Sequence, residues 1–147
     1  MHSASIIMEK DNKVYIAGVL TVAEKNMRLI FEKIAEICEE CGVCPHVPHL
    51  STDPINHPAV TPLDVWNKNY HEVTTARRVI AYVGQPSLGT GEELEMARVA
   101  GVDIIAWWFR GEKVSRMVLG NPGVVEKIEA GDEEELYSRL KLFLESN

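Results

Sequence analysis

The chain of 147 residues is short of basic residues and of long apolar stretches. Fifteen Lys and Arg against 22 Asp and Glu leave a formal charge of −7, which argues against nucleic acid or an anionic lipid surface as a partner. No apolar run approaches the roughly 20 residues that span a bilayer, and residues 1–13 lack the features of a signal peptide. We therefore expect a cytoplasmic protein that binds a small molecule or another protein.

Cysteine is also scarce, and three cysteines are too few for a disulfide scaffold. Cys38, Cys41 and Cys44 have the spacing of metal ligands, and His46 and His49 follow them. However, the first two cysteines belong to the apolar stripe of a predicted helix, and Cys44 falls on a strand that we expect to be central. Buried unpaired cysteine packs as a small hydrophobe. We therefore predict no metal site and no cofactor, and retain His49 as a candidate contact to a base or sugar.

Apolar runs that alternate with amphipathic segments are the main pattern of the chain. The runs predict five strands, at 14–20, 43–50, 79–83, 102–109 and 124–129. Strands of this kind, joined by helices, indicate a parallel sheet that is buried on both faces. We therefore predict a single domain over 1–147, of the α/β class, with a doubly wound, mostly parallel five-stranded sheet and helices on both faces, flavodoxin-like or Rossmann-like.

Helix signals fill the segments between these strands. Thr21 with Glu24, and Thr61 with Asp64, are capping-box pairs that predict where two helices begin. The first helix would carry its apolar stripe from residue 27 to residue 41 and end at Gly42. The second would bury three residues, namely Trp66, Tyr70 and Val73.

Ligands of such folds collect beyond the carboxyl ends of the strands. This rule places residues 18–21, 46–52 and 85–93 on one rim and makes Gly18 a candidate ligand contact. The stretch QPSLGTGEELEMA, residues 85–97, is the most informative of the three. It matches neither the dinucleotide fingerprint nor the Walker loop.

The glycines of this stretch predict a turn that a ligand can approach closely. Gly89 and Gly91 allow close contact with the backbone, Ser87 offers a hydroxyl, and the following helix start offers free amides to an anion. Glu92 and Glu93 would then lie in the first helical turn, where carboxylates are favoured. This preference is enough to explain Glu92.

Glu93 requires a second explanation because its neighbours line the predicted rim. An ionised carboxylate beside an anion-binding turn suits attack on a cationic carbon, such as the anomeric centre of a sugar. A nucleotide would satisfy both halves of the stretch, with its phosphate on the glycine turn and its sugar carbon against Glu93.

These motifs resemble the nucleoside 2-deoxyribosyltransferase superfamily, and especially its 2′-deoxynucleoside 5′-phosphate N-hydrolase branch. VYIAG resembles the family's opening strand and implies that Tyr15 flanks the catalytic glutamate; QPSLGTGEELEMA implies that Ser87 binds phosphate and that Glu93 is the nucleophile. VSRMVLG resembles the stretch that, in the hydrolases, reaches into the neighbouring subunit's site and helps hold the 5′-phosphate. This resemblance implies that Ser115 is a substrate-binding residue. The resemblance also implies a homodimer or higher homo-oligomer with shared sites, and a nucleoside or nucleotide as ligand.

Two positions depart from the family pattern. Asn69 stands where the family has an aspartate that binds the sugar or protonates the base, and Arg77 replaces a further aspartate. An amide donates hydrogen bonds but is not a general acid. Asp64, His71 and Glu72 are alternative acids in this segment, although Asp64 is explained as a capping residue and Glu72 as a solvated helix charge.

Three interpretations follow. The first is an enzyme that cleaves the N-glycosidic bond of a (2′-deoxy)nucleoside or its 5′-monophosphate, with Tyr15, Asn69 and Glu93 as catalytic residues and water or a second base as acceptor. The second is a nucleotide-binding sensor that has lost this chemistry, which Asn69 and Arg77 favour. The third, a receiver-like domain, has only the topology in its support.

Overall fold

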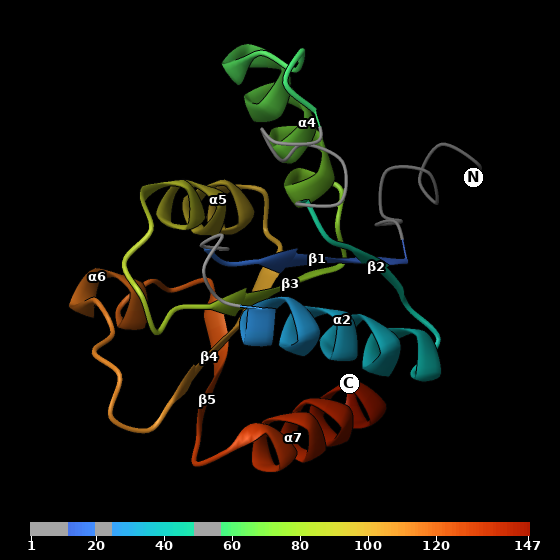
Figure 1. The fold of residues 1–147 in the computed structure, drawn as a ribbon, viewed down its shortest axis with the longest axis vertical. Helices are drawn as coiled ribbons and strands as arrows, with labels where there is room; N and C mark the ends of the chain where they lie inside the picture. The colour runs from blue at the N-terminus through green and yellow to red at the C-terminus, as the bar shows by residue number, and fades with distance from the viewer. Residues whose placement is uncertain (1–11, 20–24, 49–56) are drawn as a thin grey trace.

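Five strands form one parallel sheet in the computed structural model, which describes residues 12–19, 25–48 and 57–147 (Figure 1). The strand order is β2-β1-β3-β4-β5, and every neighbouring pair is parallel. This is the order of flavodoxin-like doubly wound folds. The prediction of an α/β fold with a parallel five-stranded sheet is therefore confirmed.

Strands and helices alternate along the chain. In chain order the elements are β1 (Lys13–Ala17), α2 (Lys25–Glu40), β2 (Cys44–His46), α4 (Pro62–Thr74), β3 (Arg78–Tyr82), α5 (Leu88–Val99), β4 (Asp103–Phe109), α6 (Arg116–Leu119), β5 (Val124–Ala130) and α7 (Glu133–Ser146). Among the helices of the described ranges, none combines the length and apolar composition that crossing a bilayer requires.

The sheet has a separate apolar core on each face, because successive residues of a strand point to opposite sides. Helices α2 and α7 cover one face, and α4, α5 and α6 lie on the other (Figure 1). In β1, Val14 and Ile16 join the core beneath α2 and α7, whereas Tyr15 and Ala17 join the core beneath α4 and α5. Tyr15 therefore belongs to the layer that contains α5.

The helix predictions are confirmed at α2 and at the start of α4. Six residues of the α2 stripe are buried, namely Met27, Ile30, Phe31, Ile34, Ile37 and Cys38. Gly42 follows the helix with φ +80°, the left-handed conformation that ends helices. Thr61 and Asp64 form the predicted capping box of α4.

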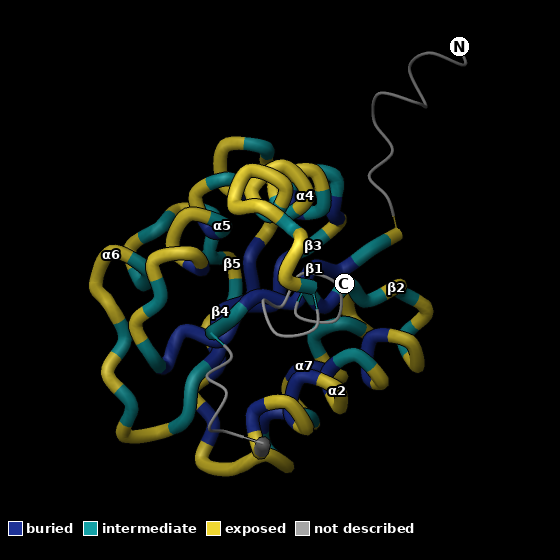
Figure 2. Tube along the Cα trace, turned by 45° about the horizontal axis from the view of Figure 1, so that its top comes forward, coloured by how far each residue is buried: buried dark blue, intermediate teal, exposed yellow. Residues whose placement is uncertain are grey.

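The predicted core face of α4 is wrong at two positions. Val73 is buried, but Trp66 and Tyr70 are 45% and 46% exposed, and their rings stack on each other with centroids 5.0 Å apart. The first turns of α4 project away from the sheet (Figure 1), and most of the helix is exposed (Figure 2). Only the end of α4 therefore reaches the core.

The second predicted strand is shorter and less central than expected. β2 pairs only with β1 and forms an edge of the sheet, so Cys44 is exposed on an edge strand and not buried on a central one. Thr21, Glu24 and His49 lie outside the described residues, so their predicted roles stay predictions.

Gly18 has a structural role at the end of β1. Its φ is +152°, and a Cβ at this position would lie 2.7 Å from Phe31 Cζ and 3.0 Å from Tyr82 Cβ. We predict that Gly18→Ala lowers the free energy of unfolding by about 1–3 kcal/mol, because both the backbone conformation and the packing become strained. Urea unfolding measures this change.

Gly89→Ala is the matched control, since a Cβ there meets nothing within 4 Å. In a helix this substitution is expected to stabilise by about 0.5–1 kcal/mol. Equal stability of Gly18→Ala and the wild type would contradict the packing role of Gly18.

Candidate active site

Three side chains from three elements meet at one carboxylate. Tyr15 Oη, from β1, donates a hydrogen bond to Glu93 Oε2, from α5. Asn69 Nδ2, from α4, donates to the same oxygen at 3.3 Å. Within the described part of the chain, the other oxygen, Oε1, accepts no hydrogen bond. The structure thus brings together the three residues that the sequence nominated as catalytic.

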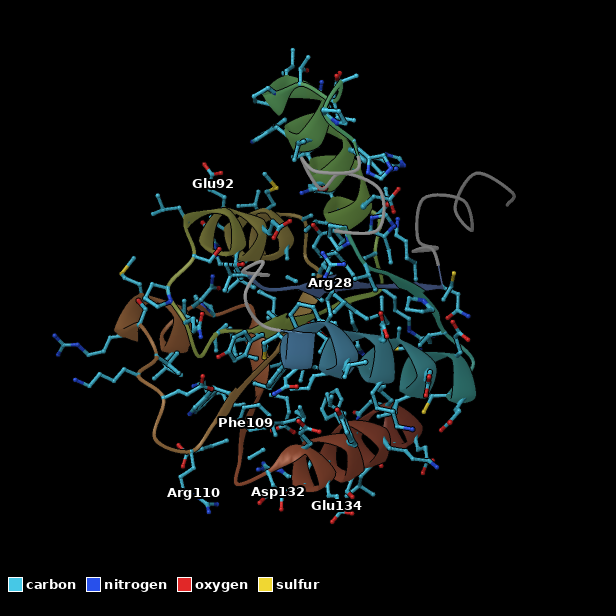
Figure 3. The ribbon with its side chains drawn as sticks, in the orientation of Figure 1. Arg28, Glu92, Phe109, Arg110, Asp132 and Glu134 are labelled. Atoms are coloured by element: carbon cyan, nitrogen blue, oxygen red, sulfur yellow. The ribbon has the colours of Figure 1, made fainter. Side chains whose placement is uncertain are left out.

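Glu93 reaches this place because α5 begins earlier than expected. Ser87 is the N-cap, and its hydroxyl accepts a hydrogen bond from the Thr90 amide at 3.2 Å. The helix starts at Leu88, so the expected position of Glu92 and Glu93 in its first turn is wrong. Glu92 points outward from α5, away from the sheet (Figure 3). The helix-dipole explanation of Glu92 therefore does not apply.

The environment of Glu93 changes its ionisation. Burial raises the pKa of Glu93 to about 7; the hydrogen bond from Tyr15 lowers the pKa, and the charge of Glu92 raises it. At neutral pH, both the protonated form and the ionised form that the sequence analysis expects are therefore populated. Burial and the nearby Glu93 charge also raise the pKa of Tyr15 far above its ordinary value, so its hydroxyl stays protonated and acts as a donor.

A second group of side chains, namely His46, Glu72 and Lys13, lies next to Tyr15. The His46 ring stacks on the Tyr15 ring with centroids 5.7 Å apart, and burial lowers the pKa of His46. Glu72 Oε2 lies 3.7 Å from His46 Nδ1 and 2.6 Å from Lys13 Nζ. Glu72 is thus ion-paired, and its interpretation as a solvated helix charge is wrong.

Two buried polar atoms of this region have no hydrogen-bond partner among the described residues. They are His46 Nε2 and Asn69 Oδ1. The sequence analysis did not identify His46 as a neighbour of Tyr15. Its position at the carboxyl end of a predicted strand, on the expected ligand-binding rim, could have indicated it.

Three of the serine and glycine residues proposed to bind substrate line a cavity, and Gly89 does not. A cavity of about 530 Å³ lies between the start of α5 and the segment leading into α6, and Ser87, Gly91 and Ser115 line it within one chain. Lys113 joins them, and Ser115 also caps α6. Gly89 is not among the lining residues.

The cavity and the carboxylate lie on neighbouring faces of α5. Thr90, Gly91 and Leu94 line the cavity, whereas Glu93 does not and instead faces Tyr15 and Asn69. No three His, Cys, Asp or Glu side chains of the described ranges are grouped as metal ligands would be.

No family model matches the sequence, and no curated protein matches it. Solved structures do resemble it. The CMP N-glycosidase BcmB of Clostridium botulinum has a TM-score of 0.70 and 21% identity, over 89% of this chain and 98% of that chain. The 2-deoxyribosyltransferase of Bacillus psychrosaccharolyticus has a TM-score of 0.63 and 15% identity, over 87% of this chain and 95% of that chain. The 2-deoxyribosyltransferase of Leishmania mexicana has a TM-score of 0.61 and 16% identity, over 88% of this chain and 97% of that chain. The shared property is the fold.

The raised pKa of Glu93 predicts how stability depends on pH. Between its ordinary value of 4.5 and about 7, the unfolded chain releases the proton while the folded protein keeps it, so the wild type loses stability as pH rises. Glu93→Gln removes this loss. Relative to the wild type, the variant should gain up to about 3 kcal/mol between about pH 4 and pH 8.

Urea unfolding of both proteins at the two pH values measures this gain. Glu92→Gln serves as control, since it makes the same change at the neighbouring, exposed position and leaves the Glu93 carboxyl group in place. A Glu93→Gln difference that is the same at both pH values would show that the carboxyl group is not buried in this way.

Proposed function

We propose that the protein cleaves the N-glycosidic bond of a nucleoside or its 5′-monophosphate, ribo or 2′-deoxy, with Glu93 as the nucleophile. One observation carries the proposal: Tyr15 and Asn69 both donate to Oε2 of Glu93. These contacts hold the carboxylate in place and leave Oε1 to face a substrate. The fold shared with an N-glycosidase and two deoxyribosyltransferases supports the same reaction class.

The chemistry follows from this geometry. In its ionised form, Glu93 Oε1 attacks the anomeric carbon, and the base leaves with the electron pair of the C–N bond. The resulting ester between Glu93 and the sugar is resolved by water, which gives hydrolysis, or by a second base, which gives transfer. Tyr15 and Asn69 orient the carboxylate throughout. Asn69 is not a general acid, so the leaving base takes its proton from water.

The cavity beside Glu93 supports a phosphorylated substrate. Ser87, Ser115 and Lys113 surround it, and the start of α5 presents backbone amides to an anion. We therefore propose that the 5′-phosphate occupies this cavity while the sugar lies against Glu93. The CMP in the name of the clostridial neighbour is consistent with a nucleoside 5′-monophosphate.

A nucleotide-binding sensor without turnover is the second candidate. The observation that favours it is Asn69, an amide at the position where the resembled family has an aspartate. In a sensor, the cavity would still bind a nucleotide, and Glu93 would serve only to hold the sugar.

Base release tests the enzyme proposal. The purified protein is incubated with the common nucleosides and nucleoside 5′-monophosphates, ribo and deoxy, and free base is separated by chromatography. We expect release by the wild type and a loss of about 10³-fold or more in Glu93→Gln, because the nucleophile is removed. The rate should rise with pH to a plateau, with a midpoint near 7, since the ionised form attacks.

Glu92→Gln is the matched control for this assay and should release base at nearly the wild-type rate on the high-pH plateau, where Glu93 is ionised in both proteins. Nucleotide binding by the wild type without release of any base would favour the sensor. Neither binding nor release would contradict both candidates.

We also propose that the protein is a homodimer or higher homo-oligomer with shared sites. Support comes from α4, where three large apolar side chains are exposed at helical spacing, namely Leu63, Trp66 and Tyr70. A helix of this length gains most of its stability from packing, yet only Val73 of α4 is buried. A second copy of the chain would cover this face.

Sedimentation velocity tests this proposal. Trp66→Glu is expected to weaken association by about tenfold or more, because a charge enters an apolar interface. Leu142→Glu, at an exposed apolar position of α7, is the control and should leave the sedimentation coefficient unchanged. A monomeric wild type would contradict the proposal.

A further inference from the structure

The turn after β4 is closed by the side chain of Glu112. The Phe109 amide donates to Glu112 Oε1 at 2.7 Å, and the Glu112 amide donates to the Phe109 carbonyl at 3.0 Å. Gly111, within the turn, has φ +93°. The carboxylate of Glu112 is thus folded back onto the end of its own strand.

The same carboxylate also binds the neighbouring strand. Tyr82 Oη, at the end of β3, donates to Glu112 Oε2, and Tyr82 is one of the residues that line the cavity. A Cβ on Gly84 would lie 2.5 Å from the Glu112 carboxyl carbon and 2.7 Å from Tyr82 Cε1. Residue 84 is therefore glycine where the carboxylate lies directly against the backbone.

These contacts join the two segments that form the cavity walls. One wall is residues 85–88, which directly follow Gly84, and the other includes residues 113–115, which directly follow Glu112. Each wall is therefore adjacent in sequence to one side of the Glu112 contact. Glu112 thus contacts the residues that directly precede both walls.

We propose that Glu112 is a positioning residue, which fixes the separation of the cavity walls and through it the affinity for a ligand that carries a phosphate. The assignment of phosphate to this cavity rests on the proposed function. Glu112 does not line the cavity, and its two oxygens are occupied by Tyr82 and Phe109. The role assigned to Glu112 is therefore indirect and involves no contact with the phosphate.

Loss of the carboxylate is expected to loosen phosphate binding selectively. In Glu112→Ala, the Tyr82 hydroxyl and the Phe109 amide lose their acceptor, and the two walls are no longer tied. The hydrogen bonds from the walls to the phosphate then lose their alignment. The loss of one such bond to a charged ligand raises the Kd for the phosphorylated ligand about tenfold. The proposed function places the sugar against Glu93, which does not line the cavity, so the affinity for an unphosphorylated nucleoside should change by less than about twofold.

Gly84→Ala should have the same effect by a different route, because the added methyl group displaces the carboxylate. The two substitutions act on one contact, so the double variant should weaken phosphate binding no further than either single variant. This non-additivity separates a positioning role from two independent losses of stability.

Isothermal titration calorimetry with cytidine 5′-monophosphate, cytidine and inorganic phosphate tests the proposal. The proteins are the wild type, Glu112→Ala, Gly84→Ala and the double variant. Arg110→Ala is the control from the same turn, because its guanidinium points away from the cavity toward Glu129 and Glu135, on the side where Figure 3 shows Asp132 and Glu134. It should bind all three ligands as the wild type does.

Selective loss of cytidine 5′-monophosphate and phosphate binding in the single variants, with no further loss in the double variant, supports the proposal. Unchanged binding in Glu112→Ala, or equal weakening of cytidine and its 5′-monophosphate, overturns it. Absence of phosphate binding by the wild type overturns it as well.

Two further variants complete the test. If Glu112→Ala does not fold, Tyr82→Phe removes only the hydroxyl partner and should weaken phosphate binding in the same selective way. Glu112→Gln keeps one carbonyl acceptor and should restore part of the affinity. Selective binding without any base release would leave this proposal standing and reject the proposed enzyme; base release with unchanged binding in Glu112→Ala would do the reverse.

Discussion

The site depends on placing one ionisable carboxyl group in a half-buried position and giving it two hydrogen-bond donors. Removal of a carboxylate from water is unfavourable unless donors replace the water. Tyr15 and Asn69 are these donors for Glu93. Because side chains alternate along a strand, a shift of β1 by one residue would turn Tyr15 to the opposite face of the sheet. The register of β1 thus decides whether the Tyr15 hydroxyl can reach Glu93.

Helix α5 connects the two halves of the site. Its N-cap Ser87 and its first-turn residue Gly91 line the cavity, and its next turn carries Glu93, which contacts Tyr15 and Asn69. Because both halves stand on one helix, the distance between them is set by a rigid element and not by a loop. The distance between the part of a ligand that occupies the cavity and the part that reaches Glu93 would therefore be fixed.

The strands and most helices could be predicted because apolar periodicity is local. Trp66 and Tyr70 follow the same periodicity but are exposed, since periodicity does not reveal that α4 extends past the sheet. The chemistry of residues 85–97 nominated Ser87 and Glu93, and the resemblance added Tyr15. Neither source could supply the pKa of Glu93, which depends on burial in the folded chain, or the contact between Tyr82 and Glu112, which lie 30 residues apart without a motif.

The two edges of the sheet have a consequence for how copies of the chain can meet. β2 is only three residues long and contains Pro45, which lacks the amide donor that an added strand would need. At the other edge, Lys127 and Glu129 of β5 are exposed, and charged residues oppose strand addition. The sheet is thereby protected against growth by edge-to-edge pairing, a common route to aggregation.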